Sequence, residues 1–196
     1  LREIYIENTH LSDLPDVIYE ITSLEKLSLH GNYIQNISSK ISNLSHLKYL
    51  DLSLNRCTQL PDLSPLIQLE HLDISANAIK KFSPIGSLTK LQKLIAFDLE
   101  IETIDVSKFP NSLRWIDLAE NNIQVLGDTS HLVDVELLDI SKTNITTLSC
   151  IPSNCKVVAI GVPKLQISDS IKRIQMDGEV FYHQRQKILH HMILKV

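Results

Sequence analysis

One spacing of apolar residues returns along almost the whole sequence and constrains the fold more than any other feature. In its clearest copy, Leu47–Asn55, apolar residues occupy the first, fourth and sixth places and an asparagine occupies the ninth. A period in the low twenties means that one short structural unit is built repeatedly along the chain. The copies begin at Leu1, Leu24, Leu47, Leu69, Leu91, Leu113, Val135, Cys155 and, with the weakest match, Ile171.

The pattern L-x-x-L-x-L-x-x-N-x-L at this period resembles the leucine-rich repeat family. The resemblance implies an α/β fold, a horseshoe-shaped solenoid with a parallel β-sheet on the concave face. Short helices, 3₁₀ helices and coil would cover the convex face. We expect about eight repeats over residues 1–170 and a C-terminal cap over residues 171–196, made of a last strand or hairpin plus a helix, because the end of a solenoid must cover its open core.

The spacing also assigns roles to the repeated residues. Apolar residues two apart in a strand point to the same side, so one side of each strand is core and the other is free. The ninth-place asparagines Asn32, Asn55, Asn77 and Asn121 offer a donor and an acceptor to backbone groups at the bend after the strand. Thr9 and Thr143 can imitate part of this role. Leu99 and, in the eighth copy, Pro163 cannot, so we expect local distortion there.

The segments that return from one strand to the next differ along the chain. The first, Leu14–Ile21, has apolar residues at near-helical spacing and predicts a short helix or tight turn. The third and fourth returns, Leu60–Leu66 and Phe82–Leu88, contain proline, which removes a backbone donor. They predict 3₁₀ turns or extended coil.

Composition argues against several classes of partner. A formal net charge of -4 gives no basic footprint for nucleic acid or an anionic membrane. No apolar run approaches the roughly 20 residues of a membrane span, and the chain opens in repeat register with no signal-peptide pattern. The abrupt start also suggests a processed chain. We expect a monomer.

Cysteine usage indicates a reducing compartment. The three cysteines, Cys57, Cys150 and Cys155, are too few for a disulfide framework, and the cysteine-rich caps of secreted family members are absent. A cytoplasmic location is expected, or the host cytoplasm for a secreted bacterial effector. Three Asn-x-Ser/Thr triplets, at Asn36, Asn43 and Asn144, are the contrary evidence, although such triplets arise by chance in an Asn- and Ser-rich repeat.

No catalytic constellation with an interpretable spacing is present, and we expect no enzymatic activity and no cofactor. His183, His190 and His191 permit a metal hypothesis, but solvent-facing histidines on a helix are commoner. Cys150 and Cys155 lack the spacing of zinc ligands. With five glycines in the chain, no phosphate-binding loop is apparent.

The concave face is therefore the candidate binding surface. It is built from the third, fifth and seventh places of each copy, and aromatic residues gather near its middle. The repeat does not require Trp115 or Tyr49, so these favour binding, whereas aspartate at the fifth place is an ordinary consensus residue. The predicted partner contacts are Tyr49, Asp51, His71, Asp73, Lys93, Ile95, Phe97, Trp115, Asp117, Leu137 and Asp139.

These features favour a non-enzymatic module that binds a protein partner on its concave face. An alternative is the substrate-recognition part of a larger enzyme or bacterial effector, such as a ligase, phosphatase or kinase. Proline-led pieces such as Phe109–Leu113 faintly resemble the returns of bacterial effector repeats. A structural spacer or oligomer scaffold is a third, weaker hypothesis.

Overall fold

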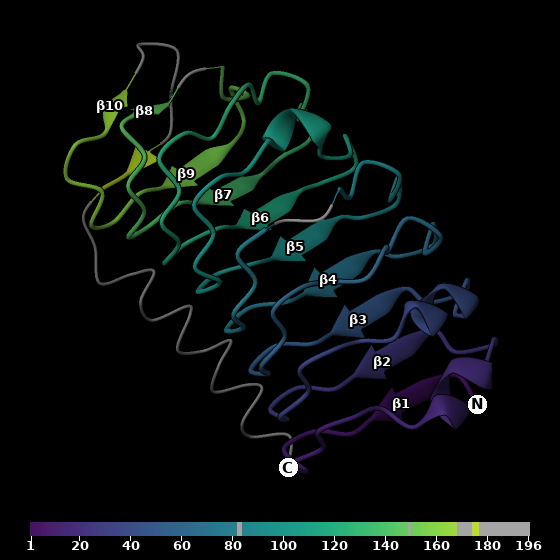
Figure 1. Ribbon diagram of the computed structural model, residues 1–196. Helices are drawn as coiled ribbons and strands as arrows, with labels where there is room; N and C mark the ends of the chain where they lie inside the picture. Colours follow the sequence, from purple (N-terminus) through teal and green to yellow (C-terminus); the bar gives the residue numbers. More distant parts are fainter. Residues whose placement is uncertain (82–83, 149, 168–173, 177–196) are drawn as a thin grey trace.

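The computed structural model describes residues 1–196 apart from 82–83, 149, 168–173 and 177–196. Its main element is a nine-stranded sheet in which each strand pairs in parallel with the strand of the next repeat. Figure 1 shows the strands stacked in chain order. The predicted parallel solenoid is confirmed. The strands are β1 Glu3–Tyr5, β2 Lys26–Ser28, β3 Tyr49–Asp51, β4 His71–Asp73, β5 Lys93–Ile95, β6 Trp115–Asp117, β7 Leu137–Asp139, β9 Lys156–Val158 and β11 Ile174–Gln175.

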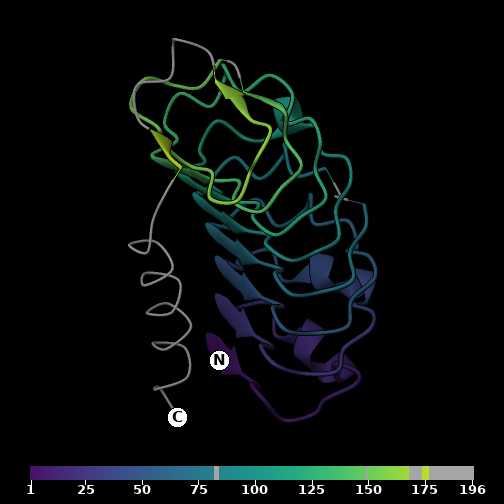
Figure 2. The same cartoon turned by 90° about the vertical axis from the view of Figure 1, so that its left-hand side faces the viewer.

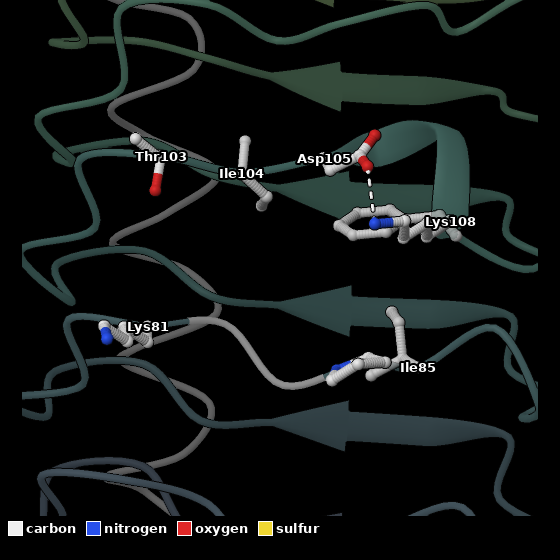
Figure 3. Close-up of a pocket in the computed structure, with 8 residues that line it drawn as sticks. Lys81, Ile85, Thr103, Ile104, Asp105 and Lys108 are labelled. Atoms are coloured by element: carbon white, nitrogen blue, oxygen red, sulfur yellow. Dashed lines mark ion pairs between the residues drawn. The ribbon is translucent and has the colours of Figure 1, made fainter.

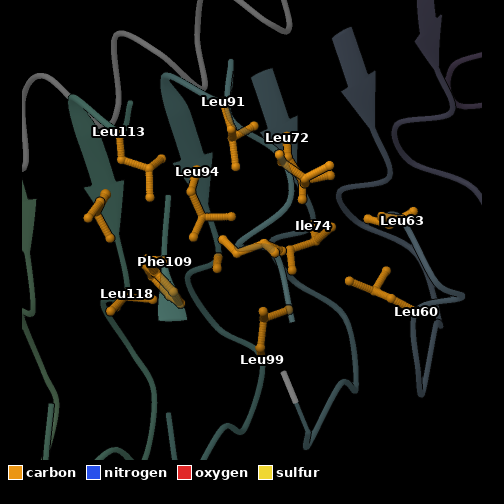
Figure 4. Packing of buried hydrophobic residues seen from close by; sticks show 14 of the residues in the cluster. Leu60, Leu63, Leu72, Ile74, Leu91, Leu94, Leu99, Phe109, Leu113 and Leu118 are labelled. Atoms are coloured by element: carbon orange, nitrogen blue, oxygen red, sulfur yellow. The ribbon is translucent and has the colours of Figure 1, made fainter. Parts of the chain in front are cut away.

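The core lies between the sheet and the return segments. The apolar residue in the middle of each strand points inward, and those of β2 to β5 have no exposed surface: Leu27, Leu50, Leu72 and Leu94. Figure 4 shows strand residues and return-segment residues filling one shared interior. Burying a leucine contributes roughly 1.5–3 kcal/mol, so stacking the turns is the main source of stability.

The return segments lie along the side opposite the sheet, as Figure 2 shows. The described residues form three helices, all of the 3₁₀ type: η1 Asp16–Glu20, η2 Ser39–Asn43 and η3 Val106–Lys108. The proline-containing third and fourth returns form no helix in their described parts. A small second sheet pairs β8 Thr147–Leu148 with β10 Gln166–Ile167. Among the described residues, no helix is long and apolar enough to cross a membrane.

The asparagines form the predicted ladder at the bend after each strand. In the third repeat, Asn55 Nδ2 donates to Leu29 O at 2.8 Å and to Leu52 O at 3.0 Å, while its Oδ1 accepts from Ile34 N at 3.0 Å. One side chain therefore joins two consecutive repeats. Thr143 reproduces one of these bonds, because its hydroxyl donates to Ile140 O at 2.7 Å.

In each of the first eight repeats the eighth place has a positive φ, which lets the chain turn out of the strand. These residues are Asn8, Gly31, Leu54, Ala76, Asp98, Glu120, Lys142 and Gly161, with φ between 51° and 68°. The predicted distortion at Leu99 is present, since Glu100 also has a positive φ of 60°. The first repeat, with Thr9 at the ninth place, has the same extra residue at His10, with φ 61°.

The predicted register of the eighth repeat was wrong by one residue. β9 pairs Leu137 with Lys156 and Leu138 with Val157, whereas the alignment on Cys155 placed Val158 at the core position. One residue is missing between the first core residue, Cys155, and the second, Val157, and both are buried. Val162, rather than Pro163, consequently stands at the asparagine place.

The predicted cap is largely outside the described residues. β11 falls within the segment predicted to supply a last strand, and it pairs with β9 at Ile174 and Val157. The boundary at residue 170, the hairpin alternative and the helix with His183, His190 and His191 lie beyond what the structure describes, so the predicted division into two parts stays a prediction.

Candidate binding face

The outward side of the nine-stranded sheet carries three rows of side chains, which we call the sheet face. It corresponds to the predicted concave face. Because consecutive strands pair in register, residues at the same place of successive repeats are cross-strand neighbours, about 4.8 Å apart. From β3 to β7 the third-place row is Tyr49, His71, Lys93, Trp115 and Leu137, the fifth-place row is Asp51, Asp73, Ile95, Asp117 and Asp139, and the seventh-place row is Ser53, Ser75, Phe97, Ala119 and Ser141.

The third-place row contains two aromatic contacts side by side. The rings of Tyr49 and His71 are stacked, with centroids 4.5 Å apart and planes 22° apart. Lys93 Nζ lies 4.5 Å from the centroid of the Trp115 ring. All four side chains are half-buried. They form a pre-arranged aromatic and cationic strip across the four central strands, β3 to β6.

The fifth-place aspartates lie below this strip and bind the backbone just after their own strand. Asp51 Oδ1 accepts from both the N–H and the hydroxyl of Ser53, at 2.8 and 2.5 Å, and Asp73 binds Ser75 in the same way. Both carboxylates are only 2% exposed. The Asp-x-Ser pairs hold the strand exits in place, which agrees with the consensus interpretation of these aspartates.

Burial sets the protonation of the groups at the centre of the sheet face. It lowers the pKa of His71 to about 4, so the imidazole is neutral at pH 7, and His71 Nε2 has no hydrogen-bond partner among the described residues. Burial raises the pKa of the Asp73 carboxyl, and the facing Asp51 raises it further. Burial also lowers the pKa of Lys93, against the opposing effect of Asp73 and Asp117. Like charges on neighbouring strands repel each other, so two facing carboxylates resist full ionisation.

The eleven predicted contact residues divide into two groups. The half-buried ones, which a partner could reach, are Tyr49, His71, Lys93, Phe97, Trp115 and Leu137. The buried ones, which form the floor of the sheet face, are Asp51, Asp73, Ile95, Asp117 and Asp139. The structure brings all eleven onto one face, and their contact with a partner stays a prediction.

A second exposed cluster was missed from sequence. Arg56 Cζ lies 4.2 Å from the centroid of the Tyr33 ring, and His10 packs against the same ring edge-to-face at 5.2 Å. All three occupy the tenth place of the first three repeats, just outside the sheet face. The signal was available in the tenth-place row, which holds a ring or a guanidinium in three consecutive copies.

Among the described residues, the potential metal ligands are dispersed, and two of the three cysteines are buried. Within the part of the chain that the structure describes, no three His, Cys, Asp or Glu residues are grouped so as to hold a metal ion. Cys57 and Cys155 are buried, and burial raises the pKa of each thiol to about 11, away from reactivity. The thiols of Cys57 and Cys155 therefore contribute to packing.

Comparison with known proteins agrees with this description. Residues 22–79 match the family model described as leucine rich repeat. A segment of 68 residues is 38% identical to the disease resistance-like protein DSC1 of Arabidopsis thaliana, and it spans 35% of this chain and 5% of that protein. The chain thus spans a small part of this relative.

Two solved structures share the fold at low sequence identity. Internalin C2 of Listeria monocytogenes superposes with a TM-score of 0.76 and 20% identity, over 89% of this chain and 80% of its own. A leucine-rich repeat protein of Leptospira interrogans superposes with a TM-score of 0.72 and 22% identity, over 90% of this chain and 44% of its own. The repeat spacing, the family match over residues 22–79 and the parallel stack of strands show that the chain has the leucine-rich repeat fold.

Proposed function

We propose that this chain is a non-enzymatic recognition module that holds a protein partner on the sheet face. The observation that carries the proposal is the strip formed by Tyr49, His71, Lys93 and Trp115. Aromatic residues dominate the energetics of protein interfaces, and here they are half-buried, so part of their surface remains available.

The size of the sheet face suits a protein partner. Nine strands at a spacing of about 4.8 Å span roughly 38 Å, which accommodates a small domain or an extended segment. A typical interface buries about 800 Å² on each side. Polar residues surround the central strip, including the exposed pair Glu3 and Lys26, joined at 2.9 Å. An interface usually has aromatic residues near its centre and a polar rim, and the sheet face has both.

The buried floor supports binding by fixing the strip in advance. Each aspartate is held by its own strand exit, and Tyr49 donates its hydroxyl to Asp51 Oδ2 at 3.3 Å. The stacked rings therefore lose little side-chain freedom when a partner arrives. Pre-organisation of this kind improves affinity because less conformational entropy is lost on association.

The test is a capture experiment with matched variants. We expect the double variant Tyr49→Ala/Trp115→Ala to lose partners that the unmodified chain captures from extracts of its source cells, with the affinity for a purified partner falling at least about tenfold. Val125→Ala removes an exposed apolar side chain, 65% accessible, from a return segment and is the control. Circular dichroism and urea unfolding establish that each variant is folded. Unchanged capture by the folded double variant would overturn the proposal.

A second candidate is that the chain is the substrate-recognition part of a larger enzyme or effector. It is favoured by the small share that the matched segment occupies in the Arabidopsis protein, 5%, and by the 44% coverage of the Leptospira chain. The sheet face would then hold a substrate for a catalytic domain elsewhere. Reading the gene beyond Val196 separates the two, since a stop codon near that position counts against this candidate.

A further inference from the structure

Two carboxyl groups of the sheet face, those of Asp51 and Asp73, lie directly opposite each other on neighbouring strands. The two residues are partners in the register of β3 and β4, and both are buried. At the strand spacing of about 4.8 Å, two negative charges that are shielded from water repel each other strongly. The fold therefore opposes the ionisation of both carboxyl groups at once.

An exposed copy of the same local motif shows what the surroundings of Asp73 change. Asp73 Oδ1 accepts hydrogen bonds from the N–H of Ser75 at 3.0 Å and from its hydroxyl at 2.6 Å. The exposed Asp62 accepts the same two bonds from Ser64, both at 2.9 Å, and these bonds lower the pKa of Asp62. The pKa of Asp73 is raised instead, first by burial and then by Asp51. Because the hydrogen bonds are alike, the difference comes from the surroundings.

A further Asp-x-Ser motif, at the start of η3, follows the exposed pattern. Asp105 Oδ1 accepts from the N–H and the hydroxyl of Ser107, at 3.3 and 2.5 Å. Figure 3 shows the ion pair of Asp105 with Lys108, which is 3.0 Å long. The bonds from Ser107, and then the contact with Lys108, lower the pKa of Asp105. Asp105 is exposed, whereas Asp73 is buried against a second carboxyl group.

The hydrogen-bond donors place a proton on Asp73 rather than on Asp51. Asp51 accepts three bonds, two from Ser53 and one from the Tyr49 hydroxyl at 3.3 Å. Asp73 accepts two, both from Ser75. Each donated bond favours the charged form of a carboxyl group, so Asp51 is the better-stabilised carboxylate of the pair.

The charges around Asp73 act in both directions. Lys93 attracts an ionised Asp73, while Asp117 adds to the repulsion from Asp51. The titratable and charged groups that face the Asp51–Asp73 pair are Tyr49 on β3, His71 on β4, Lys93 on β5, Asp117 on β6, Glu7, whose charge acts on Tyr49, and His30, whose Nδ1 lies 2.8 Å from Ser53 Oγ. Carboxyl groups outnumber the single ammonium in this set, which favours the protonated form of Asp73.

We propose that Asp73 keeps a proton in the folded protein at pH values at which exposed aspartates are ionised, and that loss of this proton is a pH-sensitive switch of the sheet face. A protonated carboxyl group is a hydrogen-bond donor, and the facing Asp51 carboxylate is an acceptor. At higher pH the proton passes to solvent, and a second negative charge appears below the stack of Tyr49 and His71. The switch belongs to the floor of the sheet face and does not depend on the protein partner proposed above.

Raising the pH should lower the stability of the folded chain through Asp73. In the unfolded chain this carboxyl group ionises near its ordinary value, about pH 4, whereas the folded chain holds the proton to higher pH. Between these two pH values the folded state binds one proton more than the unfolded state, so stability falls as the pH rises. The loss is complete once the folded carboxyl group has ionised. Asp62 has the opposite dependence, because its pKa is lowered.

Titration of the carboxyl carbon resonances by NMR tests the proposal directly on the unmodified chain. We expect Asp73 to titrate at a higher pH than Asp62, its exposed counterpart. Asp51→Asn removes the facing charge, so it should lower the titration midpoint of Asp73 by about one pH unit or more. Asp73 titrating together with Asp62, or an unchanged midpoint of Asp73 in Asp51→Asn, would overturn the proposal.

Urea unfolding at a series of pH values from about 4.5 to 8.5 tests the effect on stability. Asp73→Asn keeps the shape of the side chain without a titratable group, so its urea midpoint should rise relative to that of the unmodified chain as the pH increases. Asp62→Asn is the matched control, because it removes a carboxyl group with the same two hydrogen bonds, and it should show no such rise. A constant difference for Asp73→Asn, or an equal rise for Asp62→Asn, would contradict the proposal. If Asp73→Asn does not fold, the NMR titration of the unmodified chain still decides the question.

Discussion

The asparagines of the fourth and sixth repeats differ in how many backbone N–H groups each side chain binds. In the fourth repeat, Asn77 Oδ1 accepts one backbone N–H, that of Cys57, at 2.9 Å. In the sixth repeat, Asn121 Oδ1 accepts two, from Leu99 at 3.2 Å and from Ile101 at 3.1 Å. The repeat before Asn121 has leucine in place of its own asparagine. Asn121, in the repeat after Leu99, therefore binds one backbone N–H group more than Asn77 does.

The first repeat shows the same arrangement independently. Thr9 replaces the asparagine, and Asn32 Oδ1 accepts from both Thr9 N and Leu11 N, at 3.1 and 2.9 Å. Both irregular repeats contain the extra positive-φ residue, His10 or Glu100. Thr143 has no such companion, and the residue that follows one repeat later is Val162, which offers no side-chain acceptor. A repeat can therefore lose its asparagine when the next repeat supplies one, at the cost of a second left-handed residue.

The largest expected effect comes from replacing Asn121, whose side chain accepts two backbone N–H groups. Asn121→Ala removes the acceptor of two buried N–H groups and the donor to Ala96 O and Leu118 O, at 2.8 and 2.9 Å. Each unsatisfied buried group costs about 1–3 kcal/mol, so we expect a loss of about 3–5 kcal/mol in the free energy of unfolding, measured in urea. Asn77→Ala, which leaves one N–H without its acceptor, should cost about 2–3 kcal/mol. Equal losses would contradict the double role of Asn121.

The next effect concerns the positive φ at the eighth place, which the first eight repeats share. Gly31 has φ 67°, and an added Cβ would lie 2.1 Å from Asn8 Oδ1. Gly161 has nearly the same φ, 68°, but its nearest neighbour would be Lys142 Cγ at 3.5 Å. We expect thermal unfolding to show a cost of about 1 kcal/mol for Gly161→Ala, from backbone strain alone. Gly31→Ala should cost about 2 kcal/mol, because Asn8 must also move. A smaller cost for Gly31→Ala than for Gly161→Ala would mean that the Asn8 side chain moves away without lowering the stability.

Much of this ladder could be predicted from sequence, because a period of 22 or 23 residues fixes which residues become cross-strand neighbours. The contact of Tyr49 with His71 follows directly from that period. The register of the eighth repeat could not be predicted, because Val157, Val158 and Ala159 are all apolar and fit either alignment. The structure shows the shift at Gly161, whose φ of 68° matches that of Gly31 at the eighth place of the second repeat.

The burial of individual residues on the sheet face also could not be predicted from the sequence. The pattern places Asp51 and Tyr49 on the same outward side, but their different burial depends on side-chain hydrogen bonds, such as that from Ser53 to Asp51. The close approach of the fourth and fifth return segments at Gly86 could not be predicted either, because the repeated apolar pattern fixes the strand residues but not how unlike return segments pack.

The third prediction restores an asparagine at a repeat that lacks one. Thr143 stands at the ninth place, and its hydroxyl reproduces only the bond to Ile140 O. The backbone before it, with Lys142 at φ 53°, already has the conformation of the asparagine-bearing repeats. Thr143→Asn should add a donor for Leu118 O and an acceptor for Ile123 N, raising the free energy of unfolding by about 1 kcal/mol. A decrease in the urea midpoint would show that the seventh repeat has departed from the ladder geometry.

The smallest effect tests whether the eighth place, rather than the residue type, sets the strain. Ala76 has φ 51°, a conformation that costs an L-residue about 1–2 kcal/mol, whereas glycine adopts it freely. Glycine also raises the entropy of the unfolded chain, by about 0.5–1 kcal/mol. The difference predicts that Ala76→Gly stabilises the protein by about 0.5 kcal/mol.

Ala119→Gly is the matched control, because Ala119 is buried at the seventh place without a positive φ. It should destabilise by about 1 kcal/mol, so the same substitution changes sign between two adjacent places of the repeat. If both variants lower the urea midpoint, the left-handed turn is not a significant source of strain, and the second left-handed residue in the irregular repeats costs little.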